Sequence, residues 1–389
     1  MTWKGKHIVI VGPAYPFRGG GTSTFNERLA RELALNNKVS ILTFTLQYPN
    51  FLFPGKTQYS EDPAPQDLDI DIALNSINPV NWFKIGRKYK KIKPDIILFR
   101  YWMPFFAPCF GTFSRIVKKN NHTKLLAITD NIIPHERHAF DSLLSKYFIS
   151  TLDGALSMSK SVLNDLKRLF PKSIAANNST YNVHPLYDNF GDKISREQAA
   201  KSLNLLSHRT YLLFFGFIRK YKGLDWLIEA FSNIAKDFPN VDLIIAGEYY
   251  GGSSEYEELI KRTGLSYNSE IPENNRIHCH THFISNEDVA QYFSLTDLVV
   301  QPYKHATQSG VSQIAYHFEI PMIVTNVGGL SEIVPHEVAG WICEPNIDSL
   351  TTSLQKALEE GKIEKIKQNL PELKKQYSWS SLVENLSAL

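Results

Sequence analysis

Short apolar runs of strand length alternate along the chain with longer segments in which apolar residues recur at helical spacing. This alternation is typical of parallel sheets covered by helices. A first series of expected strands lies at His7–Val11, Lys38–Phe44, Asp95–Phe99, Lys124–Ile128 and Gly154–Met158. A second series lies at Tyr211–Phe215, Val241–Ala246, Arg276–Phe283, Leu298–Val300, Met322–Thr325 and Gly340–Cys343. The pattern predicts an α/β protein with two parallel sheets.

A polar, turn-rich stretch at Ala175–Lys193 separates the two series, as a linker would. We therefore expect an N-terminal domain at 1–185 and a C-terminal domain at 186–375. The last residues, 376–389, look helical and could pack on either domain, with packing back on the N-terminal domain as one candidate.

Composition narrows the class of protein without naming an activity. Of 389 residues, 43% are hydrophobic and 21% charged, which excludes a disordered chain. The net charge of +3 does not suit a protein whose whole surface faces nucleic acid. Three widely spaced cysteines offer neither a disulfide framework nor a Cys-x-x-Cys metal site, which favours a reducing compartment. With no signal peptide or membrane span apparent, we expect a cytoplasmic protein.

The first expected strand is followed by a glycine run, Gly19–Gly21, and then by an amphipathic helix. Thr24 and Glu27 match a capping box, which predicts that the helix begins just after the glycines. Glycines let a ligand approach the backbone, and a helix start offers free N–H groups to an anion. The spacing fits neither the dinucleotide fingerprint nor a Walker loop. We expect a phosphate or sugar contact here, and the alternative is a flexible turn.

The second series opens with a basic glycine loop, Gly216-x-x-Arg219-x-x-Lys222-Gly223, between an apolar strand and an amphipathic helix. Arg219 and Lys222 thus follow the carboxyl end of a strand, where open α/β sheets bind ligands. Fixed cations at that edge suit a diphosphate. The alternative is a solvated basic loop.

Two further glycine turns follow in the second series. Ser309 and Gly310 stand at the start of an expected helix, which makes a second candidate anion site. The strand Met322–Thr325 then runs into a glycine turn that ends in Glu332. Each turn by itself is weak evidence, whereas their order along the chain is specific.

Taken together, these segments resemble the nucleotide-sugar half of GT-B glycosyltransferases of glycosyltransferase family 4. The resemblance rests on the basic glycine loop, on Ile-Ala-Gly-Glu at 245–248, on the Ser-Gly-Val helix start and on Val-Gly-Gly-Leu-x-Glu at 327–332. It is strong over Tyr211–Leu350. Over the first half it is looser and rests on Gly19–Gly21 and the strand order.

The resemblance implies two Rossmann-like domains facing across a cleft, with the donor held mainly by the second domain. Arg219 and Lys222 would neutralise the donor diphosphate beside Gly216. The other donor-binding positions that it implies are Gly20, Gly21, Phe283, Ile284, Ser309, Gly310 and Val311. It also implies transfer with retention, no metal and no cofactor beyond the nucleoside diphosphate sugar.

The chain departs from the family pattern in the helix after Tyr303. The family usually has two glutamates there, separated by seven residues, and no register before Glu319 gives that pair. Gln308 or Gln313 could substitute, since a side-chain amide both donates and accepts hydrogen bonds.

In the first domain, the strand Lys124–Ile128 ends in a polar segment that contains Asp130 and His135. Family members often carry a histidine near this strand end, close to the sugar, so both residues are candidate catalytic groups. The alternative is a polar turn, because strand ends commonly collect Asp, Asn and Pro.

Two other patterns carry weaker hypotheses. His278, His280 and His282 alternate along an expected strand, but no further ligand cluster accompanies them, so we expect no metal site. The stretch Lys84–Lys93 holds six basic residues and no acid. It could be the solvated face of a helix or a contact with an anionic membrane at the inner face of the cell, with Trp82 and Phe83 as apolar anchors.

The expected function is transfer of a sugar from a nucleoside diphosphate sugar to a hydroxyl of a glycan or lipid-linked acceptor, in surface polysaccharide or glycolipid assembly. The alternatives are a GT-B nucleotide-sugar epimerase, an inverting transferase and a non-catalytic GT-B partner subunit. A dinucleotide oxidoreductase is disfavoured, because neither glycine loop has the fingerprint spacing.

Overall fold

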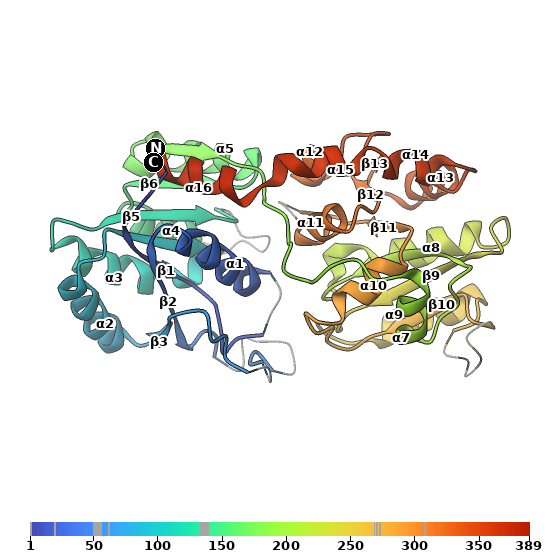
Figure 1. The fold of residues 1–389 in the computed structure, drawn as a ribbon, viewed down its shortest axis with the longest axis horizontal. Helices are drawn as coiled ribbons and strands as arrows, with labels where there is room; N and C mark the ends of the chain where they lie inside the picture. Colours follow the sequence, from blue (N-terminus) through green and yellow to red (C-terminus); the bar gives the residue numbers. More distant parts are fainter. Residues whose placement is uncertain are drawn as a thin grey trace. The chain divides into compact units, whose positions relative to one another are not determined.

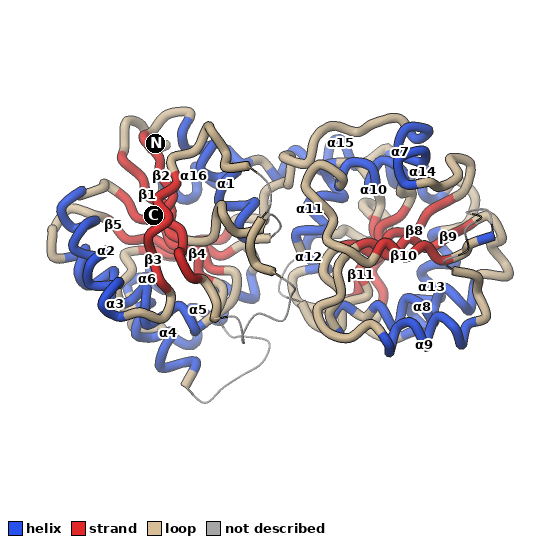
Figure 2. Tube along the Cα trace, turned by 90° about the horizontal axis from the view of Figure 1, so that it is seen from below, coloured by secondary structure: helices blue, strands red, loops and turns tan. Residues whose placement is uncertain are grey.

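The computed structural model describes residues 2–18, 21–49, 57–60, 63–132, 140–267, 269, 271, 274–306 and 309–389. The chain forms two compact units, Met1–Pro185 with Ser378–Leu389 and Leu186–Tyr377. In each unit a parallel sheet lies between layers of helices (Figure 1, Figure 2). We call them unit 1 and unit 2.

The sheet of unit 1 has seven described strands in the order β3-β2-β1-β4-β5-β6-β7. Their bounds are β1 His7–Val11, β2 Lys38–Leu46, β3 Ile70–Asn75, β4 Ile96–Tyr101, β5 Lys124–Thr129, β6 Gly154–Ser157 and β7 Ser179–Tyr181. The central strands β1 and β4 are buried on both faces, as parallel strands between helices must be.

The helices of unit 1 are α1 Thr22–Ala34, α2 Pro79–Ile92, α3 Ala107–Lys118, α4 Asp141–Ile149, α5 Lys160–Leu169 and α6 Ile174–Asn177, with a 3₁₀ turn, η2, at Pro104–Phe106. α3 packs between α2 and α4. Beneath them Phe44, Phe99, Phe110 and Phe148 form an aromatic core with ring centroids 5.0 to 6.2 Å apart. α2 begins at a proline behind the cap Asn78, whose side chain accepts from the backbone of Val80.

The C-terminal helix α16 (Trp379–Ser387) belongs to unit 1. The ring of Trp379 lies 4.9 Å from that of Phe25 on α1. Asn385 donates to the side chain of Asn182 at 2.6 Å. The backbone N–H of Trp3 donates to the hydroxyl of Ser387 at 3.2 Å, so the two ends of the chain meet in one unit (Figure 1).

The sheet of unit 2 has six described strands in the order β10-β9-β8-β11-β12-β13. They are β8 Thr210–Phe215, β9 Val241–Ala246, β10 Ile277–His280, β11 Leu298–Gln301, β12 Met322–Thr325 and β13 Gly340–Cys343. The order reverses between β8 and β11, which makes the carboxyl ends of these two strands the point where α/β sheets commonly bind ligands.

Helices cover both faces of this sheet. α8 (Leu224–Ile234), α9 (Ser254–Thr263) and α13 (Ile347–Ala357) pack together on one face, while α7 (Arg196–Leu203) and α10 (Val289–Leu295) pack together on the other (Figure 2). The remaining elements are η3 Lys220–Lys222, α11 Gly310–His317, α12 Leu330–Ile333, α14 Lys362–Lys367, α15 Leu370–Leu373 and η5 Lys374–Tyr377. Leu227 and Phe231 of α8 are fully buried against the sheet, as their helical spacing predicts.

The structure corrects four expectations. The strands β3 and β7 were not predicted, and β10 ends at His280 rather than at Phe283. The stretch expected to be a linker contains most of α6 and all of β7. α1 begins after the glycines as predicted, but its N-cap is Gly21 with no side-chain cap. Glu27 accepts instead from the backbone N–H of Tyr15 at 2.9 Å, so the capping box is wrong.

Candidate functional site

The basic glycine loop follows β8 directly and is held against the loop after β9. The backbone N–H of Ile218 donates to the carbonyl of Glu248, and that of Tyr250 donates to the carbonyl of Ile218, both at 2.9 Å. This pairing extends the sheet past its regular end. It carries Arg219 and η3 beyond the carboxyl edge of unit 2.

Lys222, at the end of η3, is a buried cation. Only 9% of the residue is exposed, and its ammonium nitrogen lies 3.3 Å from the position that a Cβ on Gly216 would occupy. The same nitrogen is 5.8 Å from the ring centroid of Tyr303. Burial, with the nearby charge of Arg219, lowers the pKa of Lys222 to about 7. An anion bound here would restore the charged form.

Arg219 lies on the ring of Tyr250, with its guanidinium carbon 3.7 Å from the ring centroid. Within the described residues, neither Arg219 nor Lys222 forms an ion pair with a carboxylate. Their neighbour Lys220 is different, because its side chain is 83% exposed and forms an ion pair with Glu255 at 3.0 Å. The loop thus sets two cations without a carboxylate partner among the described residues at the edge where α/β sheets commonly bind ligands.

Two glycines fix the shape of this loop. Gly216 has a φ of 88°, which side-chain-bearing residues rarely adopt. Gly223 has a φ of 69°, and a Cβ there would lie 2.0 Å from the carbonyl oxygen of Pro302. A larger residue at either position would displace the backbone that carries Lys222.

The start of α11 lies beside the same loop. The hydroxyls of Tyr303 and Ser309 are 3.3 Å apart, and Tyr303 is the ring that faces Lys222. A methyl carbon of Val311 lies 3.9 Å from the Cβ position of Gly216. The structure therefore brings together four residues named from the sequence, Gly216, Lys222, Ser309 and Val311.

The other described candidate residues of unit 2 belong to α11 and to the segment between β10 and α10. Gln313 is fully buried, and neither polar atom of its amide has a partner among the described residues. Gly310 abuts the ring of Tyr187, where a Cβ would lie 2.7 Å from a ring carbon. Phe283 is half-buried and Ile284 buried, in the segment between β10 and α10. Gln308 lies outside the described residues.

In unit 1, Asp130 follows β5 and is bound by Arg100 of β4. The two side chains are buried and form a bidentate ion pair with distances of 2.6 and 2.7 Å. The guanidinium of Arg100 also lies 3.8 Å from the ring centroid of Phe25. Gly21 caps α1 with a φ of 56°. Gly20 and His135 lie outside the described residues.

Sequence reasoning missed three of these participants. Tyr250 and Tyr303 support the cations from other loops, and no local pattern marks a tyrosine as such a support. Arg100 had a visible signal, because a cation inside the apolar strand Ile96–Tyr101 needs a buried partner.

The three alternating histidines do not share one site. His278 approaches the carboxylate of Asp242 at 3.3 Å, His280 contacts the hydroxyl of Tyr292 at 2.8 Å, and His282 lies beyond the end of β10. Burial and the other two histidines lower the pKa of His280 to about 4. In the part of the chain that the structure describes, no group of three or more His, Cys, Asp or Glu residues could hold a metal ion.

A known protein family matches the part of the chain that contains this loop. The family model described as "Glycosyl transferases group 1" matches residues 195–373, which include the basic glycine loop and α11. Residues 195–373 therefore form a domain of the group 1 glycosyltransferase family. The members of this family are sugar-transferring enzymes.

Two curated relatives show how far the sequence likeness extends. An uncharacterized glycosyltransferase of Methanocaldococcus jannaschii is 27% identical over 188 residues, which is 47% of this chain and 45% of that protein. The chain thus matches less than half the length of that relative. N-acetyl-alpha-D-glucosaminyl L-malate synthase of Bacillus anthracis is 22% identical over 91% of this chain and 87% of that protein.

Solved structures match over the whole chain. Sucrose-phosphate synthase from Thermosynechococcus elongatus has a TM-score of 0.71 at 17% identity and covers 98% of this chain and 97% of its own. HepE of Anabaena, solved in complex with UDP, has a TM-score of 0.73 at 14% identity and covers 98% of this chain and 100% of its own. The chain therefore has the GT-B fold, as the sequence predicted.

Proposed function

We propose that this glycosyltransferase moves a sugar from a nucleoside diphosphate sugar to a hydroxyl group of a glycan or lipid-linked acceptor, with retention of configuration, in surface polysaccharide or glycolipid assembly. The observation that carries the proposal is the pair of cations at the carboxyl edge of unit 2. Lys222 is buried beside Arg219 without a carboxylate partner among the described residues. A buried cation is costly unless a counter-charge is supplied, and a donor diphosphate would supply it.

In the proposed mechanism these two side chains stabilise negative charge and do not transfer a proton. As the sugar leaves, negative charge grows on the diphosphate, and Arg219 and Lys222 stabilise it. The leaving diphosphate accepts the proton of the attacking hydroxyl on the same face of the sugar. The proposal needs no side-chain base, no metal and no cofactor.

Uridine nucleotides are the first donors to test. The support is that HepE, which shares the fold, was also solved with UDP-glucose, at a TM-score of 0.72 and 14% identity. Gln313 stands in the helix that carries the glutamate pair in the family, and its buried amide has no hydrogen-bond partner among the described residues. We include Gln313 in the proposed donor site.

A thermal-shift screen against UDP-, GDP-, ADP- and TDP-sugars tests the donor site. A ligand at about 100 times its dissociation constant stabilises the fold by about 2.7 kcal/mol. Lys222→Ala should lose the shift, while Lys220→Ala should keep it, because Lys220 belongs to the same turn but is exposed and paired with Glu255.

Three outcomes would contradict this function. If no donor shifts the wild-type protein, the nucleotide-sugar assignment fails. Equal shifts in the two lysine variants would move the diphosphate away from η3. Conversion of the donor sugar in the absence of any acceptor would show an epimerase instead.

On the acceptor side, Asp130 and His135 stay candidates, together with Gly20 and Gly21. We expect His135→Ala to lower turnover with little loss of nucleotide affinity, because the nucleotide binds mainly to unit 2. Wild-type turnover in that variant would remove His135 from the site. The Arg100 ion pair makes Asp130 a hydrogen-bond acceptor of fixed orientation.

A further inference from the structure

The helix α2 carries one continuous exposed face. Its side chains recur at the spacing of a single helical face and line a hollow of about 410 Å³. They are Val80, Phe83, Lys84, Arg87, Lys88 and Lys91. We call these residues the outer face of α2.

The outer face is not the face that holds the helix in unit 1. Ile85, Gly86 and Tyr89 are buried on the inner side, and a Cβ on Gly86 would lie 3.0 Å from Ile116 of α3. The indole N–H of Trp82 donates to the carbonyl of Asn75 at 2.6 Å, which turns Trp82 away from the role of anchor expected from the sequence. Folding therefore leaves the outer face free for another contact.

Apolar side chains stand at one end of the outer face. Val80 is 75% exposed and Phe83 48% exposed, in the first turns of the helix. A lone exposed apolar residue is ordinary, but two adjacent ones at the start of a basic helix form an amphipathic patch of a different kind.

The rest of the outer face is positively charged. No acidic residue occurs between Pro79 and Lys93. Lys88 pairs with Asp71 at 2.6 Å, whereas Lys84, Arg87 and Lys91 form no ion pair within the described residues. Three exposed cations thus stand along one helix without a counter-charge from the part of the chain that the structure describes.

We propose that the outer face of α2 binds the surface of an anionic lipid bilayer. Val80 and Phe83 enter the boundary between headgroups and acyl chains, and Lys84, Arg87 and Lys91 contact lipid phosphates. Charge complementarity selects this occupant. Nucleic acid is a poorer fit, because single strands are held by stacking on several aromatic rings and the outer face has only Phe83.

The proposal also locates the bilayer relative to the sheet of unit 1. α2 begins directly after β3, so Val80 and Phe83 lie toward the carboxyl edge of that sheet, where α/β proteins bind ligands. A lipid-linked acceptor would arrive at this edge. Membrane binding itself does not depend on the proposed donor site, which is in unit 2.

Sedimentation with vesicles tests the proposal. The probes are phosphatidylcholine vesicles with and without phosphatidylglycerol, at low and high salt. Each cation near an anionic surface contributes roughly fivefold in partition coefficient, so Lys84→Gln with Arg87→Gln and Lys91→Gln should weaken binding on the order of 100-fold. Binding by the wild type should fall with salt, because the surface charges are screened.

Two further variants make the test specific. Lys261→Gln with Lys356→Gln and Lys365→Gln changes the net charge equally at exposed sites of unit 2, and this variant should bind as the wild type does. Val80→Ser with Phe83→Ser should weaken binding while the salt dependence remains. All substituted side chains are exposed, so the melting temperatures should match that of the wild type.

Several results would overturn the proposal. Equal sedimentation of the wild type with neutral and with anionic vesicles would be one such result. Equal binding by the two triple variants would be another. Loss of binding in Leu143→Ser, with the α2 variants unaffected, would transfer the contact to the exposed apolar residues of α4, of which Leu143 is 65% exposed. Retention on single-stranded nucleic acid that only the α2 triple variant loses, without vesicle binding, would make the partner a nucleic acid. A thermal shift with donor is measured separately, so failure here leaves the proposed function standing.

Discussion

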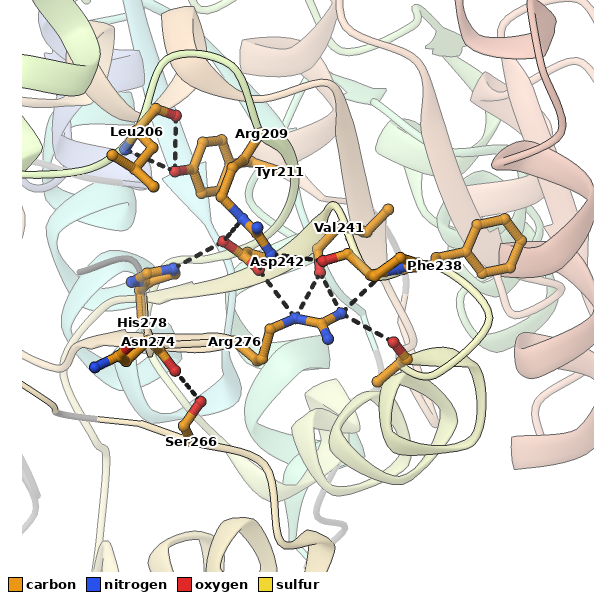
Figure 3. Close-up of polar contacts among 12 residues, drawn as sticks. Leu206, Arg209, Tyr211, Phe238, Val241, Asp242, Ser266, Asn274, Arg276 and His278 are labelled. Atoms are coloured by element: carbon orange, nitrogen blue, oxygen red, sulfur yellow. Dashed lines mark hydrogen bonds and ion pairs between the residues drawn. The ribbon is translucent and has the colours of Figure 1, made fainter. Parts of the chain in front are cut away.

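The two edges of the sheet in unit 2 both carry arginines or lysines, but they differ in whether these cations have a carboxylate partner. At the amino edge, Asp242 is fully buried and receives two hydrogen bonds from Arg209 at 2.5 and 2.6 Å (Figure 3). Arg276 and His278 approach the same carboxylate at 3.2 and 3.3 Å. At the carboxyl edge, Arg219 and Lys222 have no carboxylate partner among the described residues.

The pKa values reflect this difference. Burial by itself would raise the pKa of Asp242, but the hydrogen bonds from His278 and Arg209 and their charges outweigh it and lower the pKa. Burial and Arg219 act in the same direction on Lys222 and lower its pKa to about 7. A charge cluster whose counter-charges lie within the protein stabilises the fold, whereas buried cations without a protein counter-charge mark a candidate site for an anionic ligand.

The largest effect is expected from the amino edge. Asp242→Asn leaves two partly buried arginines without a counter-charge, and it should lower the free energy of unfolding by about 3 to 5 kcal/mol. Urea denaturation at neutral pH measures this loss. Asp237→Asn, at an exposed position without an ion pair among the described residues, is the matched control. A loss similar to that of the control would contradict the structural role of Asp242.

The same variant gives a pH signature. Because the folded-state pKa of Asp242 lies below its ordinary value of 3.8, its stabilisation is present above about pH 4 and disappears as the pH falls through the folded pKa. The stability difference between the wild type and Asp242→Asn should therefore narrow below pH 4.

At the carboxyl edge the effect should appear in activity instead. Lys222→Ala should slow sugar transfer, measured as the formation of nucleoside diphosphate, by about a hundred- to a thousandfold. This factor is equivalent to about 3 to 4 kcal/mol of transition-state stabilisation. The stability should stay the same or rise, because a buried cation without an anion is removed. Lys220→Ala is the control. A rate within about threefold of the wild type would refute the role of Lys222.

A smaller effect is expected for Arg219→Lys. The charge remains, but the planar group that lies on Tyr250 is lost, so the rate should fall by roughly tenfold. Arg262→Lys on the exposed face of α9 should leave the rate unchanged. If Arg219→Lys were as slow as Lys222→Ala, the planar geometry of Arg219 would matter more than we propose.

The smallest effect is the pH dependence of donor binding. Lys222 is depleted of its proton above pH 7, and a bound diphosphate favours the charged form. Donor affinity should therefore fall roughly fivefold from pH 7 to pH 8, with a proton taken up on binding. Titration calorimetry in two buffers of different ionisation enthalpy measures this uptake. Lys222→Met should abolish it, and persistence in that variant would assign the proton to another group.

Much of the architecture could be read from the chain. Eleven apolar runs predicted strands, and each coincides with a strand of the structure. The two missed strands, β3 and β7, are the edges of the sheet in unit 1. Edge strands bury less side chain, and only Leu74 in β3 and no residue in β7 is buried, so neither forms an apolar run.

The candidate site divides in the same way. Arg219 and Lys222 were named from the spacing of their loop, because a strand followed by a glycine turn and a helix has a known geometry. The sequence did not predict that Arg100 binds Asp130, since the two residues are 30 positions apart, one in β4 and the other just after β5. Trp82 was expected at the surface, and its hydrogen bond to Asn75 holds it inward.

The sequence by itself determined the alternation of strands and helices, the family and the loop that holds Arg219 and Lys222, because each depends on residues close together in the chain. Only the tertiary structure decided which cations are compensated. Lys220 and Lys222 are two residues apart and chemically identical, yet one is paired with Glu255 at the surface and the other is buried by Gly216 and Tyr303. Burial and counter-charge depend on residues that folding brings from distant loops, and they set the free energy of a charge.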